Sequence, residues 1–165
     1  MVTTFYLAAV VAVIATALAI SQKNVVHGLL YLIVSLLAIA LIFFVVGAPF
    51  VAALEVIIYA GAIMVLFVFV MMLLNLGLQT VEQERRWLTP RTWVGPVVLT
   101  FVLLAELLYA LAPRGLATTG PVVDPQQIGI ELFGRYAIAV ELASMLLLAG
   151  LIGAYHLGRR QLKTS

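Results

Sequence analysis

Residues 54–76 read LEVIIYAGAIMVLFVFVMMLLNL, and this stretch decides the fold class of the chain. It sits inside a nearly unbroken apolar run from Val51 to Leu74, which at about 1.5 Å per residue can cross the roughly 30 Å hydrocarbon core of a bilayer. The stretch is therefore predicted to be a transmembrane helix. Two features are unusual for a simple anchor: an acid, Glu55, in the first turns, and the small cluster Ala60-Gly61-Ala62.

The composition extends this prediction to the whole chain. Of its 165 residues, 65% are hydrophobic and 10% are charged, against about 45–50% and about 25% in soluble domains. We predict an integral membrane protein with one membrane domain, residues 1–165. The sequence has no cysteine, which excludes disulfides and iron–sulfur ligation by this chain. The two histidines lie far apart without a metal-ligand pattern, so no metal site is predicted.

Five apolar runs have the length that a bilayer demands, and an all-α protein with five transmembrane helices is predicted. The runs are residues 3–20, 26–46, 51–74, 94–112 and 136–157. Gly77 is a plausible stop for the third helix. Pro96 is expected in the first turn of the fourth, where a missing amide is tolerated. Residues 113–135 are rich in Pro and Gly and are predicted to be a loop without helix or strand.

The positions of the nine Lys and Arg residues indicate on which side of the membrane each connection between the runs lies. Short loops rich in Lys and Arg stay on the cytoplasmic side of a membrane. With the N-terminus outside, the outer segments hold Arg114 and Arg135, and the inner segments hold Lys23, Arg85, Arg86, Arg91, Arg159, Arg160 and Lys163. We therefore predict an N-out, C-in topology, with residues 77–93 inside and 113–135 outside. The same distribution indicates topology rather than nucleic-acid binding.

Three acids lie within the apolar runs. A charged side chain at the centre of a membrane helix costs about 2.5–3.5 kcal/mol on scales that measure membrane insertion. Glu55 is either an interfacial acid that reaches the headgroups or a functional group, and Tyr59 at i+4 favours a polar pair on one face. Glu141 is either functional or satisfied by Ser144 at i+3. For Glu106 we favour contact with a partner subunit or with loop residues.

The side chains of the third run also differ in size along the helix. The small cluster at residues 60–62 is followed by bulky side chains, namely Met64, Phe67, Phe69, Met71 and Met72. One extra residue in a turn, a π-bulge, would rotate everything beyond it by about 100°, because a regular helix has 3.6 residues per turn. Such a helix can act as a rotary switch. The alternative is that the small residues only let another helix approach closely, and spacing alone favours that alternative.

Four segments together resemble one family. They are the third run itself, VHGLLYL at residues 26–32, EQERRWL at 82–88 and VELASMLLLAGL at 140–151. In one register over nearly the whole chain they are similar to subunit J of bacterial NADH-quinone oxidoreductase, the counterpart of mitochondrial complex I subunit 6. Two positions depart from the family pattern, Val25 and Arg135, where a proline is common.

The resemblance implies a five-helix subunit in the membrane arm of the complex, in the bacterial inner membrane, beside subunits A, H and K. The complex uses FMN, iron–sulfur clusters, NADH and quinone, but the resemblance implies that this chain binds none of them. It also implies a π-bulge in residues 59–67, whose change to a regular helix is linked to coupling between quinone reduction and proton pumping. The residues carried over are Glu55, Tyr59 and Gly61 and, in the turning segment, Met64, Val65 and Phe67.

Two other classes of function stay open from the residues alone. The chain could be a stand-alone transporter that exchanges protons through its membrane glutamates, or a passive scaffold needed only for assembly. A transporter should work without partner subunits, whereas a coupling subunit should not. A scaffold predicts that changes at Glu55, Tyr59 or Gly61 matter only when they lower the amount of complex.

Overall fold

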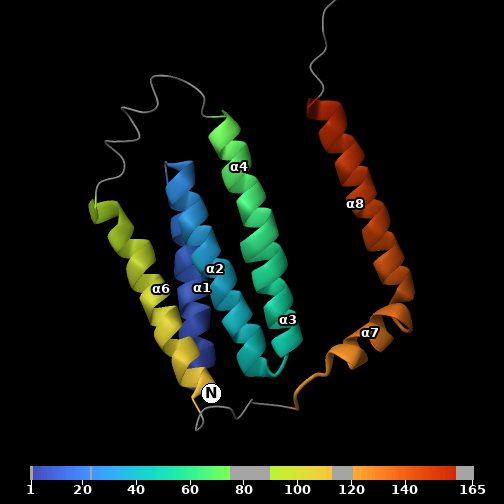
Figure 1. Ribbon diagram of the computed structural model, residues 1–165, viewed down its shortest axis with the longest axis horizontal. Helices are drawn as coiled ribbons and strands as arrows, with labels where there is room; N and C mark the ends of the chain where they lie inside the picture. The colour runs from blue at the N-terminus through green and yellow to red at the C-terminus, as the bar shows by residue number, and fades with distance from the viewer. Residues whose placement is uncertain (1, 23, 75–89, 113–120, 159–165) are drawn as a thin grey trace, which may run out of the picture. The chain divides into compact units, whose positions relative to one another are not determined.

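The computed structural model of the chain describes residues 2–22, 24–74, 90–112 and 121–158, and all regular structure in them is helical (Figure 1). It contains five helices long and apolar enough to cross a membrane, which confirms that prediction. The chain divides into two units, Met1–Val123 and Asp124–Ser165. The predicted stop at Gly77 and the cations Lys23, Arg85, Arg86, Arg114, Arg159, Arg160 and Lys163 lie outside the described residues.

The first unit is built on a close hairpin of α1 (Val2–Ser21) and α2 (Val25–Val46). Small side chains on the facing stripes, such as Ala8, Ala15 and Ala38, are fully buried and allow the helices to approach closely. The hydroxyls of Thr16 and Ser35 share a 2.7 Å hydrogen bond across the interface. The hairpin therefore combines close packing with a polar contact, as membrane helix pairs commonly do.

The ends of α2 explain one departure from the family pattern. The Asn24 side chain caps the helix by accepting a hydrogen bond from the Val26 amide at 2.9 Å. Val25 is thus the first helical residue, a position that suits proline but does not need it. At the other end Gly47 adopts a left-handed conformation with φ 99°, which glycine enters at little cost. The chain then reverses into the third span.

The third span is one rod made of three pieces. Pro49–Leu54 forms α3, Glu55–Ile63 forms a π-helix, η1, and Met64–Leu74 forms α4. All three pack along α2, as Figure 1 shows in green. The predicted π segment in the third helix is confirmed, but it begins four residues before the expected start at Tyr59 and ends at Ile63 rather than Phe67.

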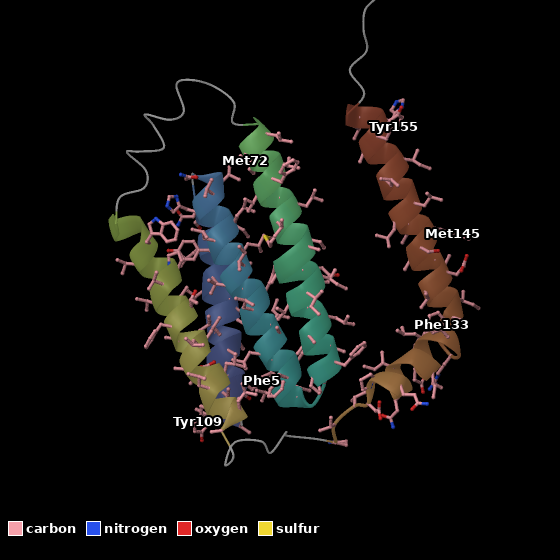
Figure 2. The ribbon with its side chains drawn as sticks, in the orientation of Figure 1. Phe5, Met72, Tyr109, Phe133, Met145 and Tyr155 are labelled. Carbon is pink, nitrogen blue, oxygen red and sulfur yellow. The ribbon has the colours of Figure 1, made fainter. Side chains whose placement is uncertain are left out.

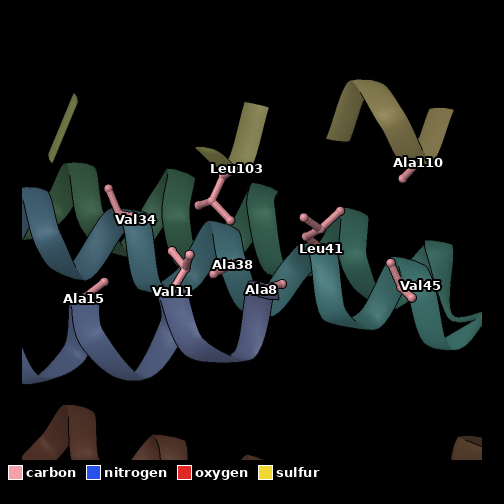
Figure 3. Packing of buried hydrophobic residues seen from close by; sticks show 9 residues of the cluster. All are labelled: Ala8, Val11, Ala15, Val34, Ala38, Leu41, Val45, Leu103 and Ala110. Carbon is pink, nitrogen blue, oxygen red and sulfur yellow. The ribbon is translucent and has the colours of Figure 1, made fainter. Parts of the chain in front are cut away.

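The fourth span, α6 (Pro90–Leu111), packs on α2 and α1. It begins earlier than predicted, so Pro96 lies inside the helix rather than in its first turn. An interior proline removes one helical hydrogen bond. Beside it, Gly95 lies so close to the Tyr31 hydroxyl of α2 that a Cβ at this position would overlap that oxygen. The core of the unit runs between α1, α2 and α6, as Figure 3 shows.

The second unit corrects the prediction for residues 113–135. Its α7 (Pro125–Phe133) is a helix within the segment that was predicted to be a loop. Asp124 caps α7 by accepting from the Gln126 amide at 2.9 Å, and Pro125 occupies the first turn. These are established start signals of helices. Arg135 lies in the turn that leads into α8 (Ala137–Gly158).

The side chains of α8 have almost no cover within their own unit. The helix has no buried residue, and Met145 and Tyr155 extend from it uncovered in Figure 2. An apolar helix that is exposed all round needs lipid or another protein around it.

Candidate functional site in the third helix

The hydrogen bonds of η1 define the candidate site. At its end the Met64 amide donates to the carbonyl of Tyr59, five residues back, as well as to that of Gly61. Bonds that span five residues are the mark of a π-helix, which is rare and is frequently found at functional sites. With nine residues, η1 occupies the small cluster at 60–62 and the turn before it.

Gly61 fits the π turn because it lacks a side chain. A Cβ built on Gly61 would lie 3.1 Å from the carbonyl oxygen of Val56, again five residues back, which is tighter than nine in ten real Cβ contacts. The close approach is made by the helix's own backbone, not by a neighbouring helix. The small residue at this position therefore serves the π geometry itself.

The side chains of η1 are half-buried or exposed. None of its nine residues is buried, and Tyr59 is 50% exposed. Glu55 is half-buried at the first position of η1. The structure gives no hydrogen bond between the side chains of Glu55 and Tyr59, and their expected pairing on one face stays a prediction.

Met64 is the point at which the π segment is held to the bundle. It is the first residue of α4 and only 3% exposed, whereas Val65 and Phe67 beside it are 67% and 50% exposed. The three residues predicted to line the turning segment thus fall into two groups. Met64 packs inward, and the other two present their side chains outward.

The two remaining membrane acids lie elsewhere. Glu141 belongs to α8 in the second unit and is exposed. Ser144 donates to its backbone carbonyl at 2.7 Å rather than to its carboxyl group. Glu106 on α6 is only 9% exposed, and both of its carboxyl oxygens are buried without a hydrogen-bond partner. The predicted contact of Glu106 with a partner subunit or with loop residues stays a prediction.

Three buried polar side chains were not predicted from the sequence, namely Thr4, His27 and Ser35. His27 in the first turns of α2 is 3% exposed, and its Nε2 has no hydrogen-bond partner. The sequence offers no signal for this burial, because α2 is apolar on every side. Within the parts of the chain that the structure describes, no three His, Cys, Asp or Glu side chains are grouped to hold a metal.

An apolar cavity of about 420 Å³ lies beside η1, between α2, α3 and α6. Val56 of η1 contributes to its wall, together with Ala52, Leu41 and Leu103. The first half of η1 therefore borders this cavity through Val56.

Comparisons with known proteins point to one family. The family described as NADH-ubiquinone/plastoquinone oxidoreductase chain 6 matches residues 4–157. The chain is 62% identical over 161 residues to the NADH-quinone oxidoreductase subunit J of Pseudomonas aeruginosa, covering 96% of this chain and 97% of that protein. It is 53% identical over 158 residues to the subunit J of Escherichia coli, covering 95% and 86%. Similarity thus spans nearly the whole length of all three chains.

Proposed function

Since this chain belongs to the family of NADH-quinone oxidoreductase subunit J, we propose that it helps couple quinone reduction to proton pumping through a change of register in its third helix. Membership makes it a multi-pass subunit in the membrane arm of that complex. The observation that carries the proposal is the π-helix η1, in which a Cβ at residue 61 would crowd the Val56 carbonyl and in which Met64 next to it is buried.

The proposed movement removes one residue from the π turn. Everything beyond the turn then rotates by about 100° relative to α3. If α3 stays in place, Ile63 takes the position that Met64 has against α2. The exposed side chains of Val65 and Phe67 turn with α4 and present a different face to whatever surrounds them.

The free-energy cost of such a movement is limited because it takes place in a membrane. A side chain that leaves the core enters lipid or a partner interface, which is as apolar as the core, so the cost is lost packing rather than exposure to water. Methionine adapts its shape readily through three rotatable bonds. The cavity beside Val56 supplies room for the N-terminal half of η1 to adjust.

Glu55 is the polar group that the movement would affect most directly. It starts η1, and Tyr59 lies within the same segment. A return to regular helical bonding would change the offset between the two side chains. In this proposal the change opens and closes a hydrated link from the quinone side to the proton channels, with Glu55 supporting the polar path and Glu141 as a further candidate.

The surroundings of the chain follow from the same proposal. Subunits A, H and K are its proposed neighbours in the bacterial inner membrane, with the chain oriented N-out and C-in. The uncovered α8 supports contact with other subunits, because its Gly150, Gly153 and Ala154 leave room for a close helix. FMN, the iron–sulfur clusters, NADH and quinone are proposed to bind to other subunits.

The substitution Gly61→Leu in the assembled complex tests the proposal. A side chain at residue 61 crowds the Val56 carbonyl and disfavours the π turn. We expect coupled quinone reduction and proton pumping to be lost, while electron transfer from NADH to an artificial acceptor stays intact. Ala62→Leu is the matched control: it enlarges an exposed neighbour that already has a Cβ in this register.

Three outcomes separate the candidate functions. Normal pumping by an assembled Gly61→Leu complex would rule out the switch. A loss of activity proportional to a loss of assembled complex would support a passive scaffold. Proton exchange by the chain alone in lipid vesicles would favour a stand-alone transporter.

A further inference from the structure

The helix α7 comes directly before a membrane span and turns away from it. The span α8 has 22 residues, which give about 33 Å of helix, close to the hydrocarbon core of about 30 Å, so Ala137 lies near its boundary. Only residues 134–136 join the two helices, and three residues reach at most about 10 Å. Figure 1 shows α7 leaving the start of α8 sideways instead of continuing its axis. The helix α7 therefore stays near the level of the lipid headgroups.

Backbone contacts hold the bend between the two helices. The Tyr136 amide donates to the carbonyl of Glu131 at 2.9 Å, and the Ala137 amide donates to that of Gly134 at 3.4 Å. A Cβ at Gly134 would lie 2.7 Å from the carbonyl oxygen of Ile130, a distance that real Cβ atoms essentially never show. The turn is thus as tight as glycine allows, and it sets the direction of α7 relative to α8.

One face of α7 is apolar. Ile128, Leu132 and Phe133 follow one another at intervals of four residues and one residue and fall on the same side of the helix. We call these three residues the apolar stripe. Gln127 and Glu131, also four residues apart, lie on the other side. Figure 2 shows the nitrogen and oxygen atoms of the side chains around α7 mostly on the side away from α8.

The second unit gives the apolar stripe little cover. No residue of α7 is buried, and Leu132 and Phe133 are 42% and 81% exposed. Ile130, which lies outside the stripe, is 65% exposed. An isolated helix of nine residues is too short to be stable in water, because helices of this length depend on packing of their apolar face. The stripe therefore needs an apolar surface from outside its unit.

We propose that α7 lies in the membrane surface, with the apolar stripe between the upper acyl chains of one leaflet. Amphipathic helices bind bilayers in this way, with the apolar face at the boundary between headgroups and acyl chains. The residues that follow suit the headgroups. Arg135 is exposed, and a guanidinium group binds phosphate well. Tyr136 is 51% exposed and belongs to the residue types that are enriched at membrane interfaces. This position does not depend on the proposed change of register in η1.

Cysteine labelling of the assembled complex in phospholipid nanodiscs tests the position of α7. The chain has no cysteine, so a charged, water-soluble maleimide labels this chain only at an introduced residue. Leu132→Cys and Glu131→Cys are a matched pair, because the two positions are adjacent and both are exposed within the chain. We expect Leu132→Cys to react at least about 10-fold more slowly in the nanodisc, and both to react equally fast in the denatured chain. Equal rates in the nanodisc would overturn the proposal.

Photolabelling of the wild-type complex separates cover by lipid from cover by protein. A phospholipid with a diazirine near the glycerol end of its acyl chain should label Ile128, Leu132 and Phe133 more than Gln127 and Glu131, as mapped by mass spectrometry. Slow reaction of Leu132→Cys without lipid labelling of α7 would show that another subunit covers the stripe, and it would overturn the proposal. Since photolabelling uses the unaltered chain, it decides the question even if a cysteine variant does not assemble.

Discussion

Replacing Gly61 by alanine should shift the third helix from the π register towards the regular register. The added Cβ would lie 3.1 Å from the Val56 carbonyl oxygen in the π register, so one of the two must move by a few tenths of an ångström. Overpacking of this kind costs about 1–3 kcal/mol. Alanine also stabilises a helix over glycine by about 1 kcal/mol, but that gain is common to both registers and cancels.

The remaining difference of about 1–3 kcal/mol corresponds to an expected 5- to 150-fold change in the ratio of the two registers. The assay is structure determination of the assembled Gly61→Ala complex, with particles sorted by the register of residues 55–64. The matched control is Gly150→Ala on α8, where a new Cβ meets nothing within 4 Å. It makes the same chemical change without crowding a π turn.

The reasoning would be refuted by an unchanged ratio of registers in Gly61→Ala. It would equally be refuted if the π register became more populated, since the crowding argument has a fixed sign. A shift of similar size in Gly150→Ala would show that the effect does not come from the contact with Val56.

Three further predictions concern the packing that supports the site. Gly95→Ala should lower the stability of the full chain in detergent by about 1–3 kcal/mol, because its Cβ would overlap the Tyr31 hydroxyl. Adding Tyr31→Phe should restore most of the loss. Purely additive effects of the two substitutions in thermal unfolding would contradict the contact. A double-mutant cycle of Thr16→Val and Ser35→Ala should give a coupling of about 0.6 kcal/mol for their 2.7 Å hydrogen bond, and zero coupling would argue against it. Asp124→Ala should cost α7 about 1 kcal/mol and speed hydrogen exchange at the Gln126 amide, which loses its acceptor; unchanged exchange would contradict the cap.

The number of spans was predictable because a bilayer imposes a length on every apolar helix. The residues at which the helices begin and end were less predictable. The fourth helix begins at Pro90 and continues through Pro96, since packing on α2 offsets one missing hydrogen bond. The helix α7 was not predicted because residues 113–135 contain three Pro and four Gly, which are helix breakers. Asp124 and Pro125 nevertheless form a start signal for a helix.

Which way a side chain faces was not predictable for these helices. A membrane helix that is apolar on every side has no polar face to mark its outside. The burial of Met64 and Glu106 and the exposure of Val65 therefore follow from packing against α1 and α2, which one sequence does not encode in its periodicity. The small residues 60–62 do lie within the π segment. Gly61 is near the end of η1, however, whereas the expected segment 59–67 would have placed it near the start.

The most direct test of the account is the register of residues 55–64 in the wild-type complex, compared at rest and during steady turnover with NADH and quinone. We predict two populations during turnover, one with the π-helix and Met64 against α2, and one with a regular helix and Ile63 in that position. A complex that pumps protons while every particle keeps the π register and Met64 in place would contradict the central claim.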